Sequence, residues 1–328
     1  MRPEEIIREF EKKGYRFYGT GGVEICHWTR KSILGEGTCY KETFYGVPAH
    51  RCMEFSPAAL FCNNNCIYCW RPAEFLQPPK DVEWTEPEEM VEHLIELRKQ
   101  LLIGFRGNPK VDREKLEEAF IPVHFAISLS GEPTLYPHLP HLIRYLQQRE
   151  GTFSVFLVTN GQVPDMLEKV VKNAPPTQLY LSLTAPTPEL YRKISVPTAE
   201  DAWERLVRSV EIVSRARTRT VLRITVIRGW NDTLAEKWAA LIKRANAHFV
   251  EFKAYMHVGY SQHRLPRDAM PEHEYVKEFA QKVMRGLKYR YMDEHIPSRV
   301  VVYRNEGRKC ERWIKGPKPS DNSFEVEE

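Results

Sequence analysis

Three cysteines of this 328-residue chain fall close together, at Cys62, Cys66 and Cys69. Their Cys-x3-Cys-x2-Cys spacing directly follows an apolar run over residues 55–61. Three thiolates can bind three irons of a 4Fe-4S cubane and leave the fourth iron open to a ligand, as chemistry at a cluster requires. Zinc is the alternative, but a structural zinc site takes four ligands, and His50 is the only nearby histidine. The spacing therefore favours a reactive iron–sulfur cluster.

A second set of cysteines, Cys26, Cys39 and Cys52, is separated by twelve residues at each step within a glycine-containing segment. Clustering of six of the seven cysteines in residues 26–69 indicates metal binding instead of a disulfide framework. Scattered buried cysteines are the alternative. We predict a second iron–sulfur cluster, again with one open iron, and expect Cys310 to be a free thiol.

The composition excludes some classes of protein. With 42% hydrophobic residues, 28% charged residues and no long uninterrupted apolar run, the chain predicts no membrane span and no leader. We expect a cytoplasmic monomer. The net charge of +4 permits a polyanionic partner without requiring one.

Apolar β-type runs alternate with amphipathic helical runs along the chain. The predicted strands are 55–61, 123–130, 153–159, 178–184, 221–227 and 249–256, and the predicted helices are 87–103, 139–148, 163–172, 199–215, 234–247 and 271–287. Six βα units can form a doubly wound sheet or an incomplete barrel, and both place chemistry at the carboxyl ends of the strands. Residues 298–305 suggest an extra edge strand. The organisation we predict is an N-terminal extension with the second cluster ligands (1–54), a barrel (55–305) and a flexible tail (306–328).

The first cysteine motif, after the first strand of such a series and with Tyr68 before its last cysteine, resembles the radical S-adenosylmethionine (SAM) superfamily. This resemblance implies an incomplete (β/α)6 TIM-type barrel of the α/β class, with SAM held on the open iron. Ser130-Gly131-Glu132-Pro133 is similar to the motif that receives the SAM amino group, although it could be an ordinary turn. Residues placed where members contact the rest of SAM are Asn160, Ser182 and Asn231. Asn160-Gly161 also suits a turn, and Ser182 could face the core.

The two cysteine sets together are similar to the tRNA 4-demethylwyosine synthase family. The similarity extends over the segments 45–54, 69–71, 102–109, 128–133, 226–231 and 251–256. It implies that pyruvate condenses with 1-methylguanosine, next to the anticodon of tRNA-Phe, to give 4-demethylwyosine. It also implies two 4Fe-4S clusters, SAM, and an external flavodoxin or ferredoxin as low-potential electron donor, because the 61 residues before Cys62 are too few for a flavodoxin domain.

Lys41, two residues after Cys39, matches a lysine for which that family implies a Schiff base with the keto group of pyruvate. An anionic cluster nearby would favour the protonated amine, so an electrostatic anchor for the pyruvate carboxylate is the alternative. A solvated surface lysine is the simplest alternative.

The RNA-binding residues are less clear from the sequence. The basic groups at helix ends or in loops are Arg98 and Lys99; Arg106, Lys110 and Arg113; Arg215, Arg217 and Arg219; and Lys309, Arg312 and Lys315. Two rival functions stay open: a radical SAM enzyme that acts on a protein or peptide, and a noncatalytic, zinc-stapled RNA-binding module.

Overall fold

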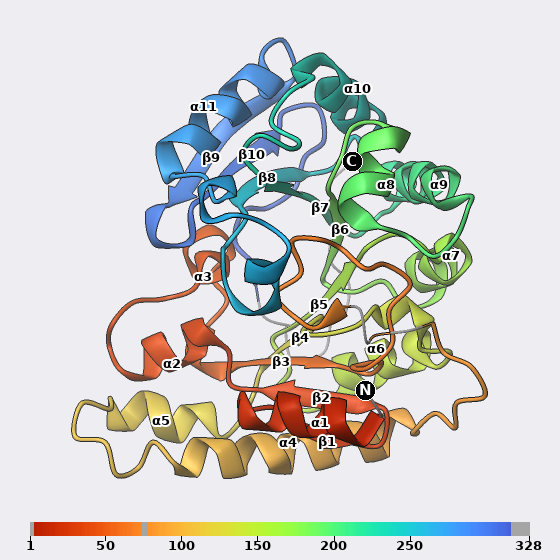
Figure 1. Cartoon of the computed structure of the whole chain (residues 1–328). Helices are drawn as coiled ribbons and strands as arrows, with labels where there is room; N and C mark the ends of the chain where they lie inside the picture. The colour runs from red at the N-terminus through yellow and green to blue at the C-terminus, as the bar shows by residue number, and fades with distance from the viewer. Residues whose placement is uncertain (1–2, 74–75, 77, 316–328) are drawn as a thin grey trace.

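One open, curved sheet organises the chain in this computed structural model, which describes residues 3–73, 76 and 78–315 (Figure 1). The strand order is β1-β2-β3-β4-β5-β6-β7-β8-β10-β9, so the sheet has two free edges and does not close. Six central strands are parallel: β3 (Cys52–Ser56), β4 (His124–Ile127), β5 (Ser154–Thr159), β6 (Gln178–Leu183), β7 (Arg219–Val226) and β8 (Phe249–Ala254). The predicted incomplete six-unit barrel is confirmed.

Helices that follow these strands cover the outer face of the sheet (Figure 1). They are α4 (Pro87–Ile103), α5 (Arg113–Ala119), α6 (Leu139–Gln148), α7 (Pro164–Asn173), α8 (Pro188–Ser195), α9 (Ala202–Arg215), α10 (Ala235–Ala245) and α11 (His273–Met284). Proline stands in the first turn of α4, α6, α7 and α8, where its missing N–H costs no hydrogen bond. The largest hydrophobic core lies between these helices and the sheet, around residues such as Leu94, Leu142, Leu206 and Trp238.

The N-terminal segment extends the sheet and then covers its inner face. After α1 (Pro3–Lys12), β1 (Arg16–Tyr18) and β2 (Gly21–Glu24) pair antiparallel beside β3. The short helices α2 (His27–Ile33) and α3 (Tyr40–Tyr45) follow. Phe44 and Tyr45 of α3 are fully buried in a second core with Phe156, Tyr180 and Phe249 from the inner face of β5, β6 and β8.

At the other end of the sheet, β9 (Tyr289–His295) and β10 (Val300–Asn305) form an antiparallel pair. The extra strand predicted over residues 298–305 is present as β10, but its predicted position at the edge was wrong, because β10 lies between β8 and β9. Residues 306–315 pack back on the body: Ile314 is buried, and Arg312 donates to the carbonyl of Phe44. The remainder of the predicted tail, 316–328, lies outside the described residues.

No helix among the described residues combines the length and the apolar character needed to cross a membrane.

Replacing Phe44 with alanine should lower the free energy of unfolding by about 3–5 kcal/mol, because a fully buried ring leaves a cavity between α3 and the sheet. Urea unfolding followed by fluorescence measures this loss. Ile103→Ala is the control: its side chain is 52% exposed, so it should change stability by less than about 0.5 kcal/mol. Equal losses in the two variants would contradict the packing described for α3.

Candidate active site

The loop that carries Cys62, Cys66 and Cys69 follows β3 and is held through its backbone. The amides of Asn65 and Ile67 donate to the carbonyls of Val196 and Ile194, at 3.0 and 2.9 Å. These contacts tie the loop to the end of α8, so a segment without regular structure has a fixed position.

Arg264, in the segment that follows β8, holds the same loop from the other side of the sheet. Its guanidinium donates to the carbonyl oxygens of Cys66 (2.9 Å), Cys69 (2.6 Å) and Arg71 (2.8 Å). Three carbonyls bound to one planar cation fix the curvature of the chain around the cysteines. Sequence reasoning missed this arginine, because it lies far away in the chain and no local motif surrounds it.

The chemistry of these cysteines fits a metal cluster. All are free thiols, and burial, followed by the charge of Cys66, raises the pKa of Cys62. Burial and the charge of Cys69 raise the pKa of Cys66 to about 12. Buried thiols of this kind ionise when a cation compensates the charge, as a bound metal does. Burial and then the charge of Cys66 raise the pKa of Tyr68, so the structure places Tyr68 beside Cys66.

Glu132 connects the ends of two strands next to this loop. Its carboxylate accepts from the Thr134 amide (3.0 Å) and hydroxyl (2.5 Å), the Thr159 hydroxyl (2.6 Å) and the Asn160 amide (2.8 Å). Burial raises its pKa, and these hydrogen bonds oppose that rise. The Asn160 side chain continues the network to Asn63 in the cysteine loop, at 2.9 Å. The Glu132 carboxylate therefore positions its neighbours.

Gly131 makes a close approach that no other residue could make. Its φ is +70°, and a Cβ placed there would lie 2.0 Å from the carbonyl oxygen of Ala58 and 2.5 Å from that of Phe61. Ser130 beside it is buried, and its hydroxyl has no hydrogen-bond partner among the described residues. A buried polar atom without a partner, next to the cysteine loop, fits a ligand that supplies one.

The other two predicted SAM contacts, Ser182 and Asn231, differ in the hydrogen bonds that they make within the protein. The Asn231 amide donates to the carbonyls of Thr184 and Thr225, both at 2.7 Å, and accepts from the amide of Ile227. Its side chain thus joins the ends of β6 and β7. The Ser182 hydroxyl accepts from Arg223 at 3.3 Å and is half-buried on the inner face.

The second set of cysteines lies at the ends of three elements. Cys26 precedes α2 and accepts from the Thr29 amide at 3.4 Å, Cys39 precedes α3, and Cys52 begins β3. Burial and then the charge of Cys26 raise the pKa of Cys52, and burial raises the pKa of Cys39 to about 12. Their charges act on one another, as those of Cys62, Cys66 and Cys69 do within the first set. Two separate groups of thiols result, and each fits a metal cluster.

Lys41 on α3 points toward the inner face of the sheet. Its Nζ lies 5.4 Å from the ring centroid of Phe156 on β5 and 5.7 Å from that of Tyr180 on β6. Its charge acts on the pKa of both Cys39 and Cys52. The structure thus places Lys41 in the interior beside the second set of cysteines.

Three charged residues of the inner face escaped sequence reasoning: Arg223 on β7 and Glu251 and Lys253 on β8. Glu251 is fully buried and accepts from the hydroxyls of Tyr45 (2.7 Å) and Tyr180 (3.2 Å). Burial, followed by the charge of Arg223, lowers the pKa of Lys253 to about 8. Alternating charged residues in a strand usually indicate a solvent face, so only the curvature of the sheet identifies this face as interior.

Several residues considered from sequence have structural partners. Arg98 is buried and donates to the carbonyls of His50 and Cys52, and Arg219 donates to that of Arg312, so neither is placed to bind RNA. His50, the possible zinc ligand, pairs with Glu118 at 2.5 Å.

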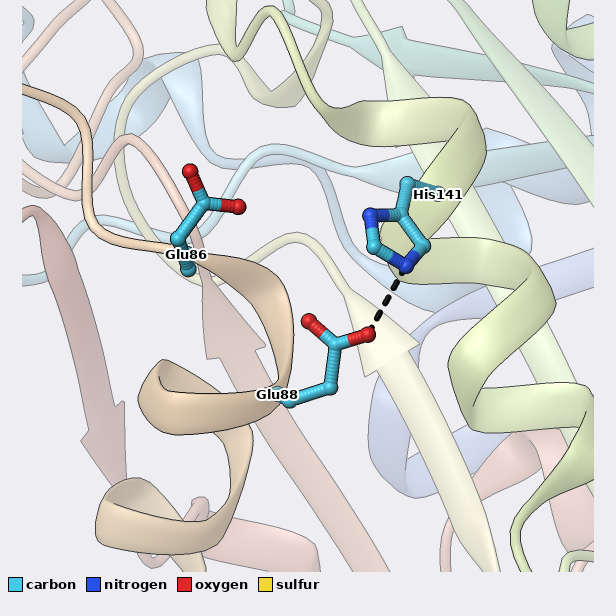
Figure 2. A group of neighbouring side chains, drawn as sticks. All are labelled: Glu86, Glu88 and His141. Atoms are coloured by element: carbon cyan, nitrogen blue, oxygen red, sulfur yellow. Dashed lines mark ion pairs between the residues drawn. The ribbon is translucent and has the colours of Figure 1, made fainter.

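A separate group, Glu86, Glu88 and His141, lies where α4 meets α6, on the outside of the barrel (Figure 2). Glu88 pairs with His141 at 2.8 Å, and both side chains are nearly half exposed. We regard this group as a surface ion pair with a neighbouring carboxylate.

The chain matches two family models: the Radical SAM superfamily over residues 57–242, and Wyosine base formation over residues 244–305. The S-adenosyl-L-methionine-dependent tRNA 4-demethylwyosine synthase of Pyrococcus abyssi is 46% identical over 304 residues, which cover 92% of this chain and 88% of the relative. The protein of the same name from Methanocaldococcus jannaschii is 39% identical over 315 residues, which cover 94% and 98%.

Two solved structures are similar over nearly the whole chain. The structure of TYW1 with a lysine–pyruvate adduct bound gives a TM-score of 0.85 at 38% identity, covering 94% of this chain and 98% of that one. The crystal structure of archaeal TYW1 gives a TM-score of 0.79 at 34% identity, covering 95% and 100%.

We expect Gly131→Ala to destabilise the cysteine loop and to lower the iron bound by Cys62, Cys66 and Cys69. Gly151→Ala is the matched control, because Gly151 also has a positive φ, +77°, but nothing lies within 4 Å of a Cβ there. The control should cost about 1–2 kcal/mol of stability for backbone strain alone, and Gly131→Ala about 1–3 kcal/mol more for the clash. Thermal unfolding and iron analysis measure both effects. Similar losses in the two variants would argue against the close approach.

Proposed function

This chain belongs to the tRNA 4-demethylwyosine synthase family of radical SAM enzymes, and from that premise we propose how its residues divide the work. The enzyme uses SAM and an iron–sulfur cluster to form 4-demethylwyosine in a tRNA. We propose that it holds two 4Fe-4S clusters and condenses pyruvate with 1-methylguanosine beside the anticodon of tRNA-Phe. The observation that carries the proposal is Lys41, which lies in the barrel beside the second of two separate thiol triads.

Cys62, Cys66 and Cys69 would hold the cluster that binds SAM, because three thiolates leave one iron open. When bound, this cluster and SAM supply an electron and a carbon radical that can take hydrogen from the N-methyl group of the base. Around it, the buried Ser130 hydroxyl and the carbonyls near Gly131 offer polar contacts for the amino acid part of SAM. The Glu132 and Asn160 network fixes the strand ends that carry these contacts.

Cys26, Cys39 and Cys52 would hold the second cluster, on the side of the interior where Lys41 lies. We propose that the Lys41 amine attacks the keto carbon of pyruvate. A C=N bond forms, the keto oxygen leaves as water with the two protons lost from nitrogen, and no electron is transferred. The lysine–pyruvate adduct in the structurally similar TYW1 supports this reaction.

The tRNA base would enter at the carboxyl ends of the strands. Trp70 directly follows Cys69, Trp230 follows β7, and both rings are partly exposed. Exposed aromatic rings can stack on a base that has left its helix. An external low-potential donor would supply the electron.

Anaerobic turnover tests the division between the clusters. The reconstituted protein, SAM, dithionite, pyruvate and 1-methylguanosine-containing tRNA-Phe should give both 5′-deoxyadenosine and the tricyclic base, read by mass spectrometry. Cys62→Ala should lose both products, and Cys52→Ala should lose the tricyclic base but still cleave SAM. Each variant should lose about four irons per chain. Wild-type SAM cleavage with no modified tRNA would refute the proposed substrate.

A reducing trap tests Lys41. Borohydride added to the protein with pyruvate should fix the adduct on Lys41, because reduction converts the imine into a stable amine. Lys41→Arg should abolish trapping while SAM cleavage without tRNA continues. Lys31→Arg is the control, since Lys31 lies on α2 and pairs with Glu36 at the surface. Trapping at another lysine, or none in the wild type, would refute this role of Lys41.

A further inference from the structure

We propose that Arg223, supported by Ser182, binds the carboxylate of the short 2-oxo acid whose keto carbon reacts with Lys41. The inference rests on the proposed function, and it assigns the residue that selects an acid over a neutral ketone. Arg223 matches no motif of the sequence. It lies on β7, and its side chain is on the inner face of the sheet.

The strand register places Arg223 within a row of polar side chains. Ser182, Arg223 and Glu251 are lateral partners on β6, β7 and β8, so their side chains share one face of the sheet. Tyr180 and Lys253 lie two residues along the same strands and point to that face as well. Arg223, Ser182 and Lys253 are half-buried, whereas Glu251 beneath them is fully buried. The row therefore lies on the face of the sheet toward which Lys41 points from α3.

Arg223 and Lys41 meet at one aromatic ring. The guanidinium carbon of Arg223 lies 5.9 Å from the ring centroid of Tyr180, and Nζ of Lys41 lies 5.7 Å from the same centroid. Glu251 fixes this ring by accepting from the Tyr180 hydroxyl at 3.2 Å. In a 2-oxo acid the keto and carboxylate carbons are bonded to each other, so its amine and its anchor must come from neighbouring groups. Arg223 and Lys41, which both lie within 6 Å of the Tyr180 ring, are the two groups that we assign to these roles.

The inner face carries charges of both signs, but its cations Arg223, Lys41 and Lys253 make no ion pair among the described residues. Within residues 3–73, 76 and 78–315, no carboxylate oxygen lies within 4.0 Å of a nitrogen of Arg223, Lys41 or Lys253. Glu251 is a nearby carboxylate: its Oε1 accepts from Tyr45 and Tyr180, and its Oε2 has no hydrogen-bond partner among the described residues. Half-buried cations without an ion pair gain from a bound anion, which restores hydrogen bonds and charge balance.

Arg223 suits a carboxylate better than the lysines do. A guanidinium presents two parallel N–H groups that match the two oxygens of a carboxylate. The Ser182 hydroxyl accepts one of its N–H groups at 3.3 Å and so orients the fork. Lys41 is left for the keto carbon, and Lys253, with its Nζ 4.9 Å from the ring centroid of Tyr40, adds positive charge beside α3.

The test compares pyruvate with its neutral amide, pyruvamide, in the holoenzyme without SAM or tRNA. Borohydride trapping on Lys41 and calorimetric titration report adduct and binding separately. Wild type should prefer pyruvate, and Arg223→Gln should raise the half-saturating pyruvate concentration about 10- to 100-fold while barely changing that of pyruvamide. Arg223→Lys should fall between them. Arg215→Gln, on the outer helix α9, should behave as wild type.

The outcomes separate the two proposals. An Arg223→Gln enzyme that keeps the wild-type preference for pyruvate overturns the anchor, and an equal loss of both ligands shows a structural role and overturns it too. Absence of trapping in wild type refutes the Schiff base, while calorimetry still decides the anchor. If Arg223→Gln fails to load iron, Ser182→Ala replaces it and should weaken pyruvate about 2- to 5-fold without affecting pyruvamide. An unchanged preference in Ser182→Ala would then overturn the proposal.

Discussion

The packing of α3 on the inner face of the sheet is the interaction on which the site depends. In a barrel with helices only outside, the inner face needs another cover, and here Phe44 and Tyr45 supply it. Because Cys39 directly precedes this helix and Lys41 lies in its first turn, burying the two aromatic rings also fixes the Cys39 thiol and the Lys41 amine. A hydrophobic contact thus sets the positions of Cys39 and Lys41, although the segment that precedes them is a loop.

The two faces of the sheet solve different problems. The outer face carries mainly apolar side chains into the main core, and its stability follows from the area buried. On the inner face, thiols, cations and the carboxylates of Glu54 and Glu251 are held in a mostly aromatic surrounding. Burial raises the pKa of the thiols of Cys39 and Cys52, and the charge of Lys41 opposes that rise.

The elements predicted best from the sequence are those whose structure depends on local patterns. The bounds 87–103 and 139–148 were confirmed for α4 and α6, because apolar residues recur at helical spacing and proline stands in the first turn. Strand β9 was missed: Tyr289–His295 is half exposed and contains no apolar run, so its pairing with β10 decides its structure. The roles of Asn231 and Glu251 depend on partners from other strands, Thr184 for one and Tyr45 for the other. No pattern in a single strand contains that information.

The hold of Arg264 on the cysteine loop has a consequence for how the protein is made. Cys66 and Arg264 are 198 residues apart in the chain. At a translation rate of about 5–20 residues per second, the ribosome completes the loop about 10–40 s before it reaches the arginine. During this interval the nascent cysteines lack the clamp that gives the loop its shape. The loop therefore acquires the shape that Arg264 gives it only after the chain has been synthesised past residue 264.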